Sequence, residues 1–164
     1  MSVRWIITLA AAGSAALLLG AWGFQYLGGM APCKLCYWQR YPHQAAVLIG
    51  LVALIWPRVW LAIGGGVAAA ATAAIGAYHS GVEAGFWQGP TSCTSAAVSG
   101  LSAEDLMARI MAAPLVRCDD IAWQMAGISM AGWNALMSLV LCAVWLWAAW
   151  SIYAPRAAAT FPRR

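Results

Sequence analysis

Cys33-Lys34-Leu35-Cys36-Tyr37-Trp38-Gln39-Arg40 stands just before the apolar run 45–56, and this junction decides the fold. The run predicts a helix, which places the two cysteines at the mouth of a membrane span and Arg40 one helical turn beyond Cys36. Residues four apart share a helix face, so Cys36 and Arg40 are expected to project together. A CxxC pair in this position can act as a redox couple, and Arg40 can hold a polar head group at the same depth.

The composition is that of a membrane protein. Of the 164 residues, 63% are hydrophobic and 9% are charged, whereas soluble domains carry about 25% charged residues. No charge occurs in residues 5–27, 41–57, 59–78 or 121–154. Because a span needs about 20 apolar residues, we predict an all-α fold, a four-helix transmembrane bundle forming a single domain over residues 1–164. The spans are expected near residues 5–27, 36–56, 59–78 and 131–153.

Two loops, residues 28–35 and 79–130, are expected on the outer side of the membrane. In the longer loop, Ser102 followed by Asp105 predicts a capped start to a short amphipathic helix. The uncharged stretch before the last span is too long for one helix, so residues 121–130 are expected along the interface. The first apolar stretch exceeds the ~7–15 residues of a signal sequence, so it is predicted to be a retained helix.

The flanking basic residues place both termini inside. With that orientation, the inner segments carry five arginines and no acid: Arg4, Arg58, Arg156, Arg163 and Arg164. Most of the eleven tryptophans are expected to be interface anchors, with Trp145, Trp147 and Trp150 at the end of the last helix. The positive charge therefore reflects membrane topology, and a nucleic-acid-binding protein is excluded.

The five cysteines divide into Cys33/Cys36, Cys93/Cys118 and Cys142. Closing a loop as short as Cys33–Cys36 constrains the unfolded chain very little, so a structural disulfide there has little value. The helix N-terminus and a nearby cation instead favour the thiolate form of Cys36. The pair Cys93/Cys118 can be a structural staple or a second redox couple, and Cys142 is interpreted as a buried small hydrophobe.

Other cysteine chemistries fit the spacing less well. Structural zinc sites favour paired C-x₂₋₄-C ligands, which the pair Cys93/Cys118 does not supply, so no metal is expected. Arg40 would be costly at bilayer depth without an acidic partner, which marks it as a candidate ligand contact. His79 ends the third predicted span on the outer side and can hydrogen-bond a ligand head group or simply be solvated.

The element Cys33-x-x-Cys36-x-x-x-Arg40 at the start of the second span, with a cysteine pair in the second outer loop, resembles the DsbB disulfide bond formation proteins. The resemblance covers essentially the whole chain. It implies a protein of the bacterial inner membrane that reoxidises a periplasmic DsbA-like thioredoxin-fold oxidase. It also implies that the electrons pass to ubiquinone or menaquinone.

By position, the resemblance assigns a role to each conspicuous residue. Cys93 would be attacked by the reduced partner, and Cys118 would be its loop mate. Cys33 would exchange with the loop pair, and Cys36 would be the thiolate that meets the quinone. Arg40 would lie beside the quinone ring, and His79 matches a histidine implicated in the quinone site.

Three alternatives stay open on the sequence. A four-helix thiol–quinone enzyme of the vitamin K epoxide reductase type usually carries its CxxC pair late in the bundle, whereas here the pair opens the second span. A non-catalytic membrane scaffold would use its disulfides only structurally. A transporter would need an ion path that Asn134 and Ser138 alone do not make. The sequence leaves the quinone type and the oligomeric state open, with a monomer as the working expectation.

Overall fold

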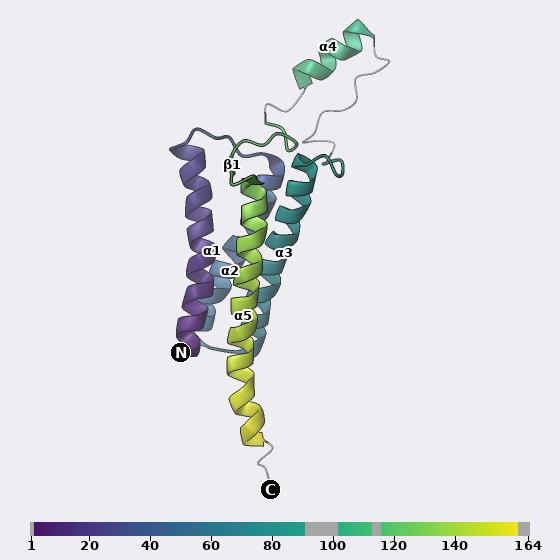
Figure 1. The fold of residues 1–164 in the computed structure, drawn as a ribbon. Helices are drawn as coiled ribbons and strands as arrows, with labels where there is room; N and C mark the ends of the chain where they lie inside the picture. The colour runs from purple at the N-terminus through teal and green to yellow at the C-terminus, as the bar shows by residue number, and fades with distance from the viewer. Residues whose placement is uncertain (1, 91–101, 113–115, 161–164) are drawn as a thin grey trace.

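The computed structural model describes residues 2–90, 102–112 and 116–160. Its body is made of four long helices that run side by side, with the start of α1 and the end of α5 toward the same end (Figure 1). They are α1 (Val3–Tyr26), α2 (Lys34–Ile55), α3 (Val59–Glu83) and α5 (Met130–Thr160). Contacts join α1 to α2, α2 to α3, α3 to α5 and α5 back to α1, so the helices close into a ring.

Three of these helices are long and apolar enough to cross a membrane: α1, α3 and the part of α5 up to Ala154. This confirms the prediction of a mostly helical membrane protein. The helix α2 is not among the three, because its first half carries polar side chains such as Gln39, Arg40 and His43. The count of four spans therefore stays a prediction.

The helix α3 runs five residues beyond the span predicted for it at 59–78 and ends at Glu83. Gly85 stops it, because its φ of +74° is left-handed and only glycine adopts that value freely. The amide of Phe86 donates to the carbonyl of Gly81 at 2.9 Å, and that of Gly85 donates to Val82 at 3.1 Å. This pair of bonds is a Schellman motif, and the added helical turn brings Glu83 into the bundle.

The packing of α3 against α5 is built around Trp145. This side chain is fully buried, with 0% of its surface exposed, so its prediction as an interface anchor is wrong. The glycine-rich face of α3 makes room for it, because a Cβ atom added at Gly65 would come within 2.5 Å of the indole. In contrast, Trp147 and Trp150 are exposed, as expected for anchors.

The remaining elements are short. The helix expected after Ser102 is present as α4 (Ala103–Ala112), and the amide of Asp105 donates to the Ser102 hydroxyl at 3.2 Å. The stretch predicted along the interface contains a small hairpin, with β1 (Gln124–Met125) paired to β2 (Ile128–Ser129). The turn between them has positive φ at both central residues, 52° at Ala126 and 76° at Gly127. The position of these elements relative to a membrane stays a prediction.

Candidate functional site

The CxxC pair forms the first turn of α2. Cys33 is the N-cap residue, and its sulfur accepts the backbone amide of Cys36 at 3.2 Å. The two sulfur atoms are 2.9 Å apart and both cysteines are free thiols. The amides at the start of a helix are unpaired and carry partial positive charge, so negative charge on sulfur is favoured here.

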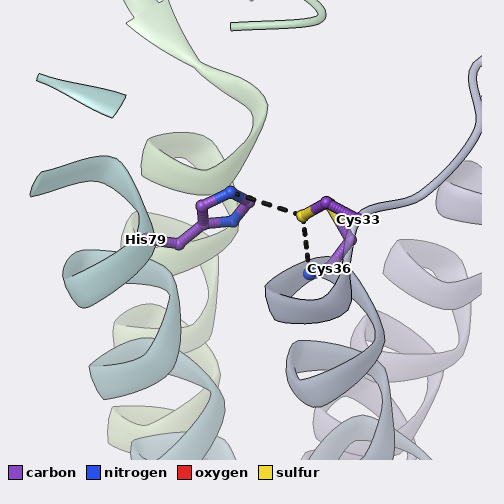
Figure 2. Close-up of side chains that lie close together, drawn as sticks. All are labelled: Cys33, Cys36 and His79. Carbon is purple, nitrogen blue, oxygen red and sulfur yellow. Dashed lines mark hydrogen bonds between the residues drawn. The ribbon is translucent and has the colours of Figure 1, made fainter. Parts of the chain in front are cut away.

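His79 reaches this pair from the last turns of α3 (Figure 2). Its Nε2 atom lies 3.6 Å from the Cys33 sulfur, and the residue is only 3% exposed. It also hydrogen-bonds the backbone of Cys118. His79 therefore contacts both the CxxC turn and the segment that contains Cys118.

Glu83 is a site residue that the sequence reasoning missed. It lies one helical turn after His79, with Oε1 3.7 Å from Nε2, and its side chain is 7% exposed. Its carboxylate is hydrogen-bonded by Ser129, while Oε2 is buried without a partner among the described residues. The spacing His79-x-x-x-Glu83 was a usable signal, because residues four apart share a helix face. The predicted third span ended at residue 78, so Glu83 was placed outside the helix and its pairing with His79 was not considered.

Cys118 is buried against the CxxC pair. It is disulfide-bonded and fully buried, and it shares a small apolar cluster with Cys33, Leu35 and Val82, against which Cys36 also packs. Its predicted partner Cys93 lies outside the described residues, so that pairing stays a prediction. The contact between the Cys118 segment and the CxxC turn could not be read from the sequence.

Arg40 is buried, at 8% exposed, yet no carboxylate of the described residues pairs with it. Its guanidinium donates to the Gln25 side chain at 2.6 Å and to the Ala21 carbonyl at 3.4 Å. It also lies 5.2 Å from the centre of the Tyr37 ring. A buried cation held only by neutral groups keeps its charge available for a ligand.

A cavity of about 340 Å³ joins these side chains, and its size falls in the range of small-molecule sites. Cys33, Cys36, Arg40 and His79 all line it, together with Glu83 and apolar residues of α1 and α5. The structure therefore brings together every predicted site residue that it describes except Cys118, which packs next to the lining residue Cys33.

A chain of buried polar side chains continues from the cavity into the bundle. Asn134 donates to Gln39 at 2.8 Å and to Thr72 at 3.1 Å, and its oxygen lies 2.9 Å from His43 Nε2. Ser138 adds a contact to His43 at 3.4 Å. The sequence reasoning missed Gln39, Thr72 and His43 as site residues, because single polar residues in apolar helices do not reveal partners on other helices.

The two thiols of the CxxC pair have different electrostatic environments. The Cys33 thiol is buried and hydrogen-bonds Cys36, and both effects raise its pKa well above the usual value for a thiol. Cys33 therefore keeps its proton and donates it toward Cys36.

Next to Cys118, Arg117 donates to Asp119 at 2.6 Å, which lowers the pKa of the Asp119 carboxyl.

The donor atoms of Cys33, Cys36 and His79 lie within 4.8 Å of one another, close enough to hold a metal ion. However, two thiolates on one tetrahedral zinc stand about 3.8 Å apart, given Zn–S bonds of about 2.3 Å. The observed 2.9 Å between the sulfur atoms is shorter. The pair is therefore better arranged for sulfur–sulfur chemistry than for zinc.

The family model described as disulfide bond formation protein DsbB matches residues 3–148. The chain belongs to the DsbB family. DsbB proteins are membrane disulfide oxidoreductases, so membership of the family implies that this chain is a membrane oxidoreductase that acts in disulfide formation.

Individual relatives are distant but cover much of the chain. Disulfide bond formation protein B of Marinobacter nauticus is 25% identical over 95% of this chain and 97% of its own length. Its namesake in Shewanella frigidimarina is 27% identical over 79% of this chain and 80% of its own. An uncharacterized protein of Rickettsia prowazekii is 29% identical over 71% of this chain and 70% of its own. No solved structure gives a significant match.

Proposed function

We propose that this DsbB-family protein is a thiol:quinone oxidoreductase that reoxidises a periplasmic DsbA-like oxidase. The observation that carries the proposal is the position of Cys118. A disulfide-bonded cysteine buried against a free CxxC pair is arranged for exchange between the two pairs. The cavity that Cys33 and Cys36 line supplies room for an electron acceptor.

The thiol steps balance as successive disulfide exchanges. A thiolate of the reduced partner attacks Cys93, which releases the Cys118 thiolate. Cys118 then attacks Cys33 of the oxidised CxxC pair, and Cys36 leaves as the thiolate. The partner's second thiolate resolves the mixed disulfide, so the partner leaves oxidised with both of its thiol protons released.

Cys93 then attacks Cys118 of the new disulfide, which restores the loop disulfide and releases Cys33 beside Cys36. The Cys33–Cys36 disulfide would re-form as this pair loses two electrons, for which a bound membrane quinone, ubiquinone or menaquinone, would supply the oxidant and leave as the hydroquinone. Cys36, Arg40 and His79 are the residues proposed to hold it. The buried Arg40 without a carboxylate partner fits this role, because a quinone ring gains negative charge at its oxygens on reduction. An acceptor of this kind is needed, because a DsbA-type oxidase has a potential near −120 mV that few protein disulfides exceed.

We further propose one membrane domain with four spans, in which α2 is the span that carries the site. Both termini are then cytoplasmic, and the cysteine pairs and α4 face the periplasm of a bacterial inner membrane. A polar first half does not exclude α2 from the bilayer, because Gln39 and His43 pair with other helices and do not face lipid.

The proposed function is tested by mixing the purified protein with a reduced DsbA-like oxidase and a soluble quinone analogue. We expect quinone absorbance to fall only when both proteins are present and Cys36 is intact. Cys36→Ser should abolish the reaction, and the matched variant Cys142→Ser, which alters the free thiol on α5, should retain it. Full activity of Cys36→Ser, or inactivity of the folded wild-type protein with both quinone types, would refute the proposal.

A further inference from the structure

Two backbone carbonyls fix the direction of the hydrogen bonds among the buried polar side chains that were described above. Gln39 Nε2 donates to the carbonyl of Leu35 at 3.2 Å, and the Thr72 hydroxyl donates to the carbonyl of Gln39 at 3.0 Å. A carbonyl oxygen can only accept. The amide nitrogen of Gln39 must therefore face Leu35, and the hydroxyl proton of Thr72 is already committed.

These two constraints orient Asn134. Since the Thr72 hydroxyl has given its proton to Gln39, it accepts from Asn134 Nδ2, 3.1 Å away. The same NH₂ group donates to Gln39 Oε1 at 2.8 Å. The oxygen of Asn134 is then left to face His43 Nε2 at 2.9 Å, which requires a proton on that nitrogen.

Hydrogen-bond direction also determines the tautomer of His79. Gln39 Nε2 lies 2.9 Å from His79 Nδ1, and it carries a second proton after donating to Leu35. Nδ1 therefore accepts, and in a neutral imidazole the proton must be on Nε2. Nε2 is the atom that faces the Cys33 sulfur at 3.6 Å and Glu83 Oε1 at 3.7 Å.

We propose that Gln39 is a positioning residue that holds His79 as the Nε2–H tautomer. The protonated Nε2, which also hydrogen-bonds the Cys118 backbone, then faces the Cys33 sulfur and cannot accept its proton. Among the residues that the structure describes, the Cys33 thiol then donates to Cys36, at 2.9 Å. Negative charge is kept on Cys36, the thiol proposed to face the electron acceptor. The inference deepens the proposed function, but its two tests need neither a partner nor a quinone.

The first test reads the tautomer directly in the wild-type protein. The chain has only two histidines, so ¹⁵N-histidine labelling gives a simple NMR spectrum of the reduced protein in detergent. We expect both imidazoles to show a protonated Nε2 and a bare Nδ1. A His79 that is protonated at Nδ1, or that averages between the two tautomers, would overturn the proposal without any variant.

The second test removes the donor. Gln39→Met keeps the length of the side chain but leaves His79 Nδ1 without its N–H partner. We expect mixed His79 tautomers and alkylation of Cys36 by iodoacetamide at neutral pH about tenfold slower, as for the loss of one hydrogen bond to a charged group. The matched control is Gln44→Met, on the exposed face of the same helix, which should retain both wild-type properties. Wild-type tautomers and alkylation rate in Gln39→Met would overturn the proposal.

Discussion

The chemistry of the site begins with the difference between two neighbouring thiols. Cys33 is 5% exposed and accepts the backbone amide of Cys36, and its sulfur is also the one that His79 contacts. Its raised pKa keeps it protonated. A thiolate is the nucleophile in disulfide exchange, so in the reduced pair the reactive sulfur is that of Cys36.

We expect this difference to appear in alkylation of the fully reduced protein. Near neutral pH, Cys36 should react with iodoacetamide at least about ten times faster than Cys33, because only thiolates react. Because the pKa of Cys33 is raised, its thiolate forms only at a more alkaline pH than an ordinary thiol requires, and its alkylation should begin only there. Peptide mass spectrometry at several pH values measures both rates. Equal rates at neutral pH would contradict the assignment.

Arg40 provides a second residue-scale prediction. Arg40→Met removes the charged donor that we assign to a quinone oxygen, so the KM for quinone should rise by at least about tenfold. Arg40→Lys keeps the charge but loses the planar guanidinium with its paired N–H donors. Its KM for quinone should therefore lie between those of the wild-type protein and Arg40→Met. Steady-state quinone reduction measures this, with far-ultraviolet circular dichroism as the folding control. An unchanged KM in folded Arg40→Met would place the quinone elsewhere.

At the residue scale, the sequence predicted relations between neighbours on one helix and missed contacts between side chains on different helices. The CxxC turn and Arg40 were predictable, because their relation depends on helix spacing alone. The links from Asn134 to His43 and Gln39 span 91 and 95 residues. No spacing rule pairs residues on different helices at such separations. Glu83 was missed because the helix end was set by charge, whereas the bundle buries that charge.

At the scale of elements, close helix packing depends on small residues. The alanine- and glycine-rich face of α3 lies against α5, with Gly65 facing Trp145. The position of Trp145 near a helix end suggested an interface anchor. Only the packing shows that the ring points inward, because about half a helix turn separates an interior position from a lipid-facing one.

Gly65→Ala should therefore destabilise the bundle. The new methyl group would meet the Trp145 indole at 2.5 Å, and overpacking of this kind costs about 1–3 kcal/mol. The matched control is Gly64→Ala, where the nearest atom is 3.8 Å away on Ile49 and an alanine favours the helix. Unfolding in sodium dodecyl sulfate with circular dichroism gives the free energies. Equal stability of the two variants would show that Trp145 can move aside.

At the scale of the whole molecule, the ring of helices has its redox residues at one end. The starts of α2 and α5 and the last turns of α3 meet there, and the segment with Cys118 covers the CxxC turn. The turn at Pro57 joins the opposite ends of α2 and α3. This polarity fits an enzyme that meets a soluble partner on one side of a membrane only.

The proposed topology can be checked with reporter fusions in a bacterial host. Alkaline phosphatase is active only outside the cytoplasm, and green fluorescent protein folds efficiently only inside. A phosphatase fused after Arg164 should be inactive, and one fused after residue 100 should be active, with fluorescence giving the opposite pattern. An active phosphatase after Arg164 would contradict a span count of four with an internal N-terminus.

The central claim is that the buried contact between Cys118 and Cys33 is the electron path between the two cysteine pairs. The most direct measurement uses Cys36→Ser, in which Cys33 has no neighbour to pair with. In the isolated variant, the free Cys33 should attack Cys118 of the loop disulfide, and Cys93 should leave as a thiol. One disulfide is exchanged for another, and peptide mass spectrometry detects the new link between Cys33 and Cys118. The same product should form when Cys142→Ser is added. A free Cys33 beside an intact loop disulfide, or a disulfide from Cys33 to Cys142, would contradict the account.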